Sequence, residues 1–228
     1  MMWNNISVVI PARVESSRVN RKVFQKIKYF GQELPLIEIK VLELLKVFPR
    51  ENIIISAGEE PLKKIALKYG VAYSVRGKEF YERGYTTTTE ESVREVLKDV
   101  RTPYVAWCPP VVPFHSSDVI KIALESFFQG GCVGSLTTAV SMKSYFWWQG
   151  NALNYFADSR HVQSQLLEPL HRIANGLYVG KTEELRIAGY FLVEPIKLFE
   201  VNEIQALDID TPEDLLLAQT LSSSYYEI

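Results

Sequence analysis

The stretch VVIPARVESSRVNRKVF, Val8 to Phe24, places a short apolar run directly before a basic loop. The run is β-branched and uninterrupted, which is typical of a strand buried on both faces of a parallel sheet. The loop carries, around two serines, the cations Arg13, Arg18, Arg21 and Lys22. A loop of this composition is either a solvated basic turn or a cradle that binds phosphate groups.

Downstream of this stretch, short apolar runs alternate with segments of helix length. Strand-like runs are NIIISA (52–57), VAYSVR (71–76) and YVAWC (104–108). Between and beside them lie the amphipathic stretches PLIEIKVLELLKVF (35–48), PLKKIALKYG (61–70) and TEESVREVLKDV (89–100). This alternation predicts an α/β fold with a doubly wound, mostly parallel sheet of Rossmann type.

The second half of the chain contains clear helix starts and one region of different texture. HSSDVIKIALESFF (115–128) opens with serines and an aspartate, and DTPEDLLLAQTL (210–221) places Thr211 at the N-cap and Pro212 at the first helical position. The intervening sequence is aromatic and β-prone. We therefore expect a single domain over 1–228, with 133–190 as a β-rich insertion that forms a lid or a subunit interface.

Composition restricts the partners and the compartment. The formal net charge of the 228 residues is −2, so no general attraction to nucleic acid or to an anionic membrane is expected. No apolar run approaches the length of a membrane span, and the N-terminus does not resemble a signal peptide. Cys108 and Cys132 are too few and too far apart for a zinc site or a disulfide framework, so we expect a cytoplasmic protein.

A second stretch with possible chemistry is ALDIDTPEDLLLA, residues 206–218. Asp208 and Asp210 alternate with Leu207 and Ile209, so we expect a strand end with both carboxylates on one side. Two such carboxylates beside phosphates are a common way to hold magnesium. The alternative is that Asp210 and Asp214 only cap the following helix.

These two stretches together resemble the cytidylyltransferases that make CMP-activated acidic sugars, the CMP-sialic acid (acylneuraminate) and CMP-Kdo synthetases. Members open on a strand followed by AR-x-x-S-[KT]-R-[IL]-P-x-K and close on DIDTPED. KYGVAYSVRG, TTTT from Thr86 to Thr89, and RIANGLYV also resemble family segments. The similarity covers nearly the whole chain and is strongest at its ends.

The resemblance implies a fold and a reaction. The fold is that of the nucleotide-diphospho-sugar transferases, and the reaction is CTP-dependent transfer of CMP to an acidic sugar of nonulosonate or octulosonate type, with release of pyrophosphate. It further implies a role in polysaccharide or glycoconjugate precursor synthesis, magnesium as cofactor, and a homodimer, with 133–190 as the region for dimerisation and acceptor binding. The partners are then small molecules, with no nucleic acid and no membrane.

The resemblance also assigns roles to individual residues. Arg13, Lys22 and Asp210 are the expected catalytic residues, and Asp208 and Asp210 the expected metal ligands. The expected nucleotide-binding residues are Arg13, Ser16, Ser17, Arg18, Lys22, Arg76 and Thr87. The expected acceptor-binding residues are Arg172, Asn175, Tyr178 and Phe191.

The chain departs from the family pattern on the acceptor side. WCPPVVPFH (107–115) stands where sialate enzymes have a QPTSPLR motif, with His115 in place of its arginine. A different acceptor or base, or a non-catalytic nucleotide-binding homologue, therefore stays open. The three histidines are scattered and indicate neither zinc nor a triad, and the cluster YFWW (145–148) is more typical of packing or a dimer surface than of base stacking.

Overall fold

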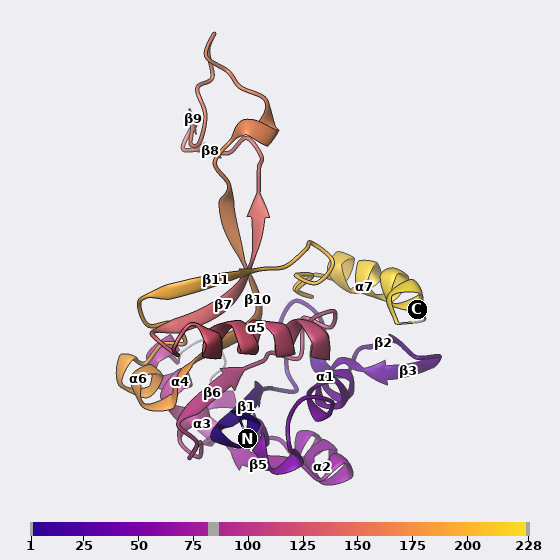
Figure 1. Ribbon diagram of the computed structural model, residues 1–228. Helices are drawn as coiled ribbons and strands as arrows, with labels where there is room; N and C mark the ends of the chain where they lie inside the picture. Colours follow the sequence, from indigo (N-terminus) through magenta and orange to yellow (C-terminus); the bar gives the residue numbers. More distant parts are fainter. Residues whose placement is uncertain (1, 82–86, 227–228) are drawn as a thin grey trace.

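The computed structural model describes residues 2–81 and 87–226 and contains a central sheet covered by helices on both faces (Figure 1). The seven-stranded sheet has the order β11-β7-β10-β6-β1-β4-β5. Its strands are β1 (Ile6–Pro11), β4 (Ile53–Ala57), β5 (Ala72–Val75), β6 (Tyr104–Trp107), β7 (Ser135–Met142), β10 (Leu170–Lys181) and β11 (Ile196–Glu200). All neighbouring pairs are parallel except those made by β10.

The helices form two layers because the central strands are apolar on both sides. Val8 of β1 packs in a core with α1 (Leu36–Leu45), α2 (Glu60–Tyr69) and α5 (Ser117–Gln129). Val9, the next residue, packs on the opposite face with α4 (Thr89–Leu97) and α6 (Thr182–Ala188). Both valines are fully buried. The doubly wound, mostly parallel architecture expected from the alternating runs is confirmed.

The remaining elements surround this core. A hairpin of β2 (Lys26–Tyr29) and β3 (Gln32–Pro35) packs against α7 (Pro212–Tyr225), and α3 spans Lys78–Tyr81. Short 3-10 turns are η1 (Met2–Asn5), η2 (Lys22–Phe24), η3 (Arg50–Asn52) and η5 (Ser164–Leu166). Within the described ranges, no helix combines the length and the hydropathy needed to cross a bilayer.

The middle region contributes both to the sheet and to a projecting arm. β7 and β10 pair on both sides of an irregularity between Ile173 and Tyr178, and the chain between the two strands, 143–169, extends away from the body in Figure 1. This arm carries the short hairpin β8 (Trp147–Trp148) and β9 (Asn151–Ala152). Of the expected β-rich region 133–190, the parts before 143 and after 169 thus belong mainly to the central sheet and its helices.

One strand predicted from the sequence is wrong. Residues 207–210 form no strand. The Leu207 N–H donates to the Ile204 carbonyl at 3.1 Å, within the preceding turn, and the Ile209 N–H donates to the Val111 carbonyl at 3.0 Å. The polar–apolar alternation in LDID fits an extended segment whether or not it pairs with a sheet. The segment nevertheless leads directly into α7, as the sequence predicts.

The sheet has a switch point beside β1. The chain passes from β1 to β4 and β5 on one side, and then returns to place β6 on the other side. β1 is parallel to both β4 and β6, so the three strands end at the same edge. Open α/β sheets bind ligands at such a point, beyond the carboxyl ends of the strands.

Candidate active site

The basic loop lies at this switch point and lines a cavity of about 180 Å³. The opposite wall of the cavity is formed by the residues that follow β6, Pro109 to Val111. Members of the predicted phosphate cradle that line it are Arg13, Ser16, Ser17, Arg18 and Lys22. The structure thus brings together five nucleotide-site residues predicted from the sequence.

The loop is held by apolar anchors and by one carboxylate. Val19 and Val23 are buried at 5% exposure each and anchor this part of the loop in the protein interior. The Val14 N–H donates to the Glu59 carboxylate at 2.8 Å, which ties the loop to the residue preceding α2. Arg21 adopts a left-handed conformation with φ 46° immediately before η2. Sequence reasoning did not identify Glu59, because an acidic residue before a helix is common.

The residues expected near the nucleotide base lie beside the cradle. Arg76 follows β5 and donates through its guanidinium to the carbonyl of Ala12, at the end of β1. Burial lowers the pKa of Arg76, and the neighbouring Arg13 lowers it further. Thr87 accepts a hydrogen bond from the Ser92 hydroxyl at 3.3 Å, while Thr86 lies outside the described residues. The base-binding role of Arg76 and Thr87 stays a prediction.

Asp210 closes the cradle from the other end of the chain. Its Oδ1 accepts from Arg18 at 2.7 Å and from Lys22 Nζ at 3.0 Å. Asp210 is positioned by the start of α7, where its backbone N–H donates to Asp214 at 3.0 Å. Thr211 and Asp214 form a reciprocal capping box, as the sequence predicts. Asp214, not Asp210, is therefore the carboxylate that caps the helix.

Asp208 lies beside Asp210 in a different environment. Its Oδ2 accepts from Asn175 Nδ2 at 2.8 Å, while its Oδ1 is buried and has no hydrogen-bond partner. Burial raises the pKa of Asp208, and the nearby Asp210 charge raises it further, whereas Asn175 and Lys22 act in the opposite direction. The orphaned oxygen is a ready acceptor for a cation or a donor group.

Unsatisfied buried groups concentrate at this edge of the sheet. Among the described residues, three buried side-chain atoms lack a partner: Ser56 Oγ, Arg76 Nε and Asp208 Oδ1. Ser56 lies near the end of β4, where its carbonyl accepts from Ala12, and Arg76 directly follows β5. Because native proteins pair nearly all buried polar atoms, a cluster of exceptions marks a place prepared for a polar ligand.

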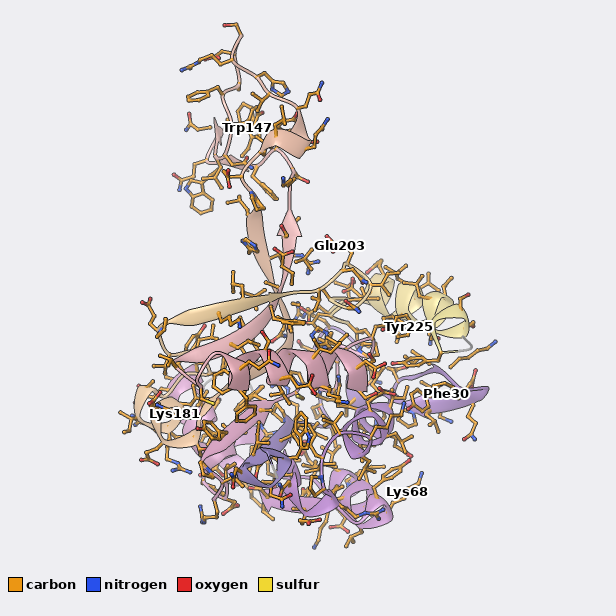
Figure 2. The ribbon with its side chains drawn as sticks, viewed as in Figure 1. Phe30, Lys68, Trp147, Lys181, Glu203 and Tyr225 are labelled. Carbon is orange, nitrogen blue, oxygen red and sulfur yellow. The ribbon has the colours of Figure 1, made fainter. Side chains whose placement is uncertain are left out.

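A second, larger cavity adjoins the carboxylates. It has a volume of about 500 Å³ and is lined by Asp208, Asp210 and Arg172, with an apolar wall that includes Leu217 of α7. Arg172 forms an ion pair with Glu203, which Figure 2 labels in the turn between β11 and α7. Glu203 is a neighbour that the sequence did not indicate, because the contact joins positions 31 residues apart.

The other predicted acceptor residues form a compact group next to Asp208. The Tyr178 hydroxyl donates to Asn175 Oδ1 at 2.9 Å. The Tyr178 ring lies 4.5 Å from that of Phe191, which also packs against Trp107 at 5.8 Å. Burial raises the pKa of Tyr178, so the hydroxyl stays protonated and acts as a donor. Their role as acceptor ligands stays a prediction.

The segment that departs from the family motif is supported by buried polar residues. His115 is fully buried between the Gln205 carbonyl, 2.6 Å from Nδ1, and the Thr138 hydroxyl, 2.9 Å from Nε2. A carbonyl only accepts, so Nδ1 carries the proton and Nε2 accepts. Burial lowers the pKa of His115 to about 3. The residue is a neutral bridge between the Gln205 carbonyl and the Thr138 hydroxyl.

Lys40 supports the same segment from α1. It is fully buried, and its Nζ donates to the Val112 carbonyl at 3.0 Å and to the His115 carbonyl at 3.2 Å. Burial lowers the pKa of Lys40. A signal was present in the sequence, because Lys40 lies midway between Leu36 and Leu44 on an apolar helix face.

The donor set at this edge fits a hard divalent cation. Magnesium is usually bound by one or two carboxylates together with substrate phosphates. Asp208 supplies an oxygen without a partner, and Asp210 is shared with the cations that would face phosphates. Within the described ranges, no group of three or more His, Cys, Asp or Glu side chains is placed to hold a metal, so phosphate oxygens and water would complete the shell.

Comparison with known proteins agrees with this geometry. The family model described as Cytidylyltransferase matches residues 7–221. The chain belongs to the cytidylyltransferase family. It is a CTP-dependent nucleotidyltransferase, and the predicted family is confirmed.

Individual relatives are similar to this cytidylyltransferase over nearly its whole length. A pseudaminic acid cytidylyltransferase of Campylobacter jejuni subsp. jejuni serotype O:2 is 27% identical, over 96% of this chain and 97% of the relative. The solved structure of CMP:2-keto-3-deoxy-manno-octonic acid synthetase complexed with CTP is similar in fold, with a TM-score of 0.65 at 15% identity and coverage of 96% and 98%. A 4-diphosphocytidyl-2C-methyl-D-erythritol synthase from Anaerococcus prevotii has a TM-score of 0.64 at 17% identity, with coverage of 96% and 98%.

Proposed function

We propose that this cytidylyltransferase transfers CMP from CTP to a hydroxyl of an acidic sugar of the nonulosonate or octulosonate type. The observation that carries the proposal is the composition of the 500 Å³ cavity, in which Arg172 lies with Asp208 and Asp210. A guanidinium recognises a carboxylate through paired hydrogen bonds, so this cavity suits a sugar acid next to the phosphates. The pseudaminic acid enzymes among its relatives support the same class of acceptor.

The reaction forms a bond between the sugar oxygen and the α-phosphorus of CTP and breaks the bond from that phosphorus to the bridging oxygen of pyrophosphate. The hydroxyl proton is released. Such transfers depend on positioning and charge neutralisation more than on covalent help from the protein. Arg13 and Lys22 line the cradle and would hold the triphosphate and its developing charge.

We also propose that magnesium is the cofactor, held by Asp208 and Asp210. When bound, magnesium neutralises phosphate charge and polarises the phosphoryl oxygens. Lys22 is only 12% exposed and already shares Asp210 with Arg18. Arrival of the nucleotide would therefore let these cations turn from Asp210 toward the phosphates.

The test measures pyrophosphate release with magnesium, each common nucleoside triphosphate and a panel of acceptors. The proposal expects turnover with CTP and with at least one nonulosonate or octulosonate. No turnover with those acids, or better turnover with neutral sugar phosphates, would overturn the acceptor assignment. Melting curves with CTP, UTP, GTP and ATP test the base separately, because a ligand specific for the native state raises Tm.

Arg172 offers a sharper test of the carboxylate contact. Arg172→Met should raise the KM for the acid about 10- to 100-fold with little change in the KM for CTP, as expected for the loss of a charged hydrogen bond. Glu203→Gln is the matched control, since it removes the competing partner of Arg172 and should leave the KM for the acid unchanged or lower it. An increase of that KM in Glu203→Gln would contradict the assignment.

We propose further that the active form is a homodimer whose contact includes the arm. The arm exposes large apolar side chains, among them Trp147, which is labelled in Figure 2. Trp147 is 57% exposed and its neighbour Trp148 is 65% exposed. Aromatic residues of this kind are enriched in interface cores. Light scattering after size-exclusion chromatography should give a mass near twice 26.1 kDa, and the double change Trp147→Ser with Trp148→Ser should shift it toward the monomer. A monomeric wild type at micromolar concentration would refute this assembly.

A further inference from the structure

A short chain of hydrogen bonds ends on the carboxylate of Asp208. The Tyr178 hydroxyl donates to Asn175 Oδ1 at 2.9 Å, and Asn175 Nδ2 donates to Asp208 Oδ2 at 2.8 Å. A carboxylate only accepts, so the amide nitrogen of Asn175 must face Asp208 and its oxygen must face Tyr178. Each end of the Asn175 amide is thus already committed to a protein partner.

The backbone is shaped to place this amide. The pairing of β10 with β7 is interrupted between Ile173 and Tyr178, which is a bulge in an otherwise continuous ladder. Asn175 lies in the bulge with φ 53°, a left-handed conformation that asparagine tolerates better than most residues. Bulges of this kind turn a side chain away from the regular alternation, here toward Asp208.

The His115 ring packs against the bulge at Gly176 and limits its movement. A Cβ on Gly176 would lie 2.5 Å from atoms of that ring, so the backbone of β10 approaches His115 as closely as a glycine allows. The ring itself is fully buried and is bonded at both nitrogens. The position of Asn175 therefore depends on a rigid support and not on a mobile loop.

The same geometry leaves little of the Tyr178–Asn175–Asp208 hydrogen-bond series available to a substrate. Tyr178 is only 5% exposed, and neither it nor Asn175 is among the residues that line the 500 Å³ cavity, whereas Asp208 is. The oxygen of Asp208 that has no partner, Oδ1, is the one that Asn175 does not hold. These hydrogen bonds thus fix Oδ2 of Asp208 and leave Oδ1 for a ligand.

We propose that Asn175 and Tyr178 are positioning residues that orient Asp208 for the metal, and are not direct ligands of the acceptor. The inference rests on the proposed magnesium site. Removal of a residue that hydrogen-bonds to a metal ligand commonly lowers metal affinity or activity about 10- to 100-fold, and we expect a loss of that size here.

The test uses two single variants, their combination and a control. Tyr178→Phe removes the hydroxyl and keeps the ring that packs on Phe191. Asn175→Gly removes the amide, and glycine accepts the left-handed backbone without strain. Tyr104→Phe is the matched control, because Tyr104 is the first residue of β6, at the opposite edge of the sheet from the site.

The first readout needs no turnover. The rise in Tm caused by CTP is measured against magnesium concentration without acceptor, and each variant's Tm without ligands checks its folding. We expect Tyr178→Phe and Asn175→Gly to need about 10- to 100-fold more magnesium for half of the effect. The double variant should match Asn175→Gly, because Tyr178 acts only through Asn175. The control should match the wild type.

The second readout separates positioning from acceptor binding. We expect kcat to fall at fixed magnesium and to recover at high magnesium, with the KM for the acid nearly unchanged. An unchanged magnesium requirement together with a higher KM for the acid would overturn this inference and leave the proposed function intact. Additive losses in the double variant would do the same. If the wild type shows no magnesium dependence, the metal site of the proposed function falls, and this inference falls with it.

Discussion

The two sides of the candidate site are built differently. On the nucleotide side, the contacts join charged side chains on loops, and the Arg18–Asp210 pair is 61% and 41% exposed. On the side of the carboxylate segment and β10, the contacts are buried hydrogen bonds through His115 and Tyr178, each 5% exposed or less. Exposed ion pairs contribute little to stability and exchange readily, whereas buried polar networks hold one geometry. The cradle can therefore change partners, while its support cannot.

The largest expected effect tests the exchangeable side. Asp210→Ala should lower turnover about 1,000-fold or more, because it removes a proposed metal ligand from the reaction centre. The free energy of unfolding should change by less than about 1 kcal/mol, since the lost pairs are partly exposed. Steady-state kinetics and urea denaturation measure the two quantities.

Glu184→Gln is the control for Asp210→Ala. It breaks the half-exposed pair, 2.7 Å long, between Lys181 at the end of β10 and Glu184 in α6. Turnover in this variant should equal that of the wild type. Equal turnover in Asp210→Ala would remove Asp210 from the mechanism.

A second prediction uses pH to probe the buried side. His115 has a pKa near 3 in the folded chain against 6.5 ordinarily, so the unfolded chain binds a proton below pH 6.5 while the native chain does not. The contribution of neutral His115 to the free energy of unfolding should be fully present above pH 6.5. It should fall by about 1.4 kcal/mol for each pH unit from there down toward pH 3. Urea midpoints between pH 4 and 7 measure this slope. The dependence of the free energy of unfolding on pH should become weaker in His115→Gln. It should stay as in the wild type in His161→Gln, a change on the exposed arm. Equal slopes in the two variants would contradict a buried, neutral His115.

The third prediction targets the contact that shapes the bulge. Gly176→Ala places a methyl group about 2.5 Å from His115 ring atoms, so β10 or the ring must move. We expect turnover to fall about 100-fold through displacement of Asn175, and the free energy of unfolding to fall by about 1–3 kcal/mol. Gly130→Ala, whose nearest neighbour would be 3.3 Å away, should leave turnover unchanged. A fully active Gly176→Ala would show that the bulge can relax without consequence.

The smallest effect should come from the exposed cation. Arg18→Gln removes the 2.7 Å pair with Asp210 while Lys22 keeps its own contact. The free energy of unfolding should change by less than about 1 kcal/mol. The KM for CTP should rise about 10-fold at low ionic strength, and this rise should be smaller at high salt, because salt screens the charge of Arg18. Binding of CTP at low and high ionic strength checks this. A large loss of stability would mean that the two sides are built alike.

Much of the fold and of the cradle was predictable because the relevant signals are local. Uninterrupted apolar runs predict buried parallel strands, and the loop after the first strand of such a sheet lies at the ligand edge. The capping pattern at Thr211 and Asp214 depends only on neighbouring residues. These features locate Arg13, Lys22 and the Asp208–Asp210 segment without knowledge of the packing.

The strand expected at 207–210 shows where local patterns fail. Alternating side chains describe any extended backbone, and pairing depends on which strand edge is free nearby. Here the segment makes a backbone bond to Val111, beyond the end of β6, and not to a strand. The alternation correctly places both aspartates along one cavity, although the strand itself does not form.

By itself, the sequence determined the doubly wound sheet, the position of the basic loop and the carboxylates before the last helix, because apolar periodicity and capping act over a few residues. Tertiary structure alone decided that Asp210 meets Lys22 across 188 positions and that Asn175 faces Asp208 across 33. It also decided that Lys40 and His115 lie buried beneath the site. Such contacts depend on the packing of distant segments, and only the folded chain brings those segments together.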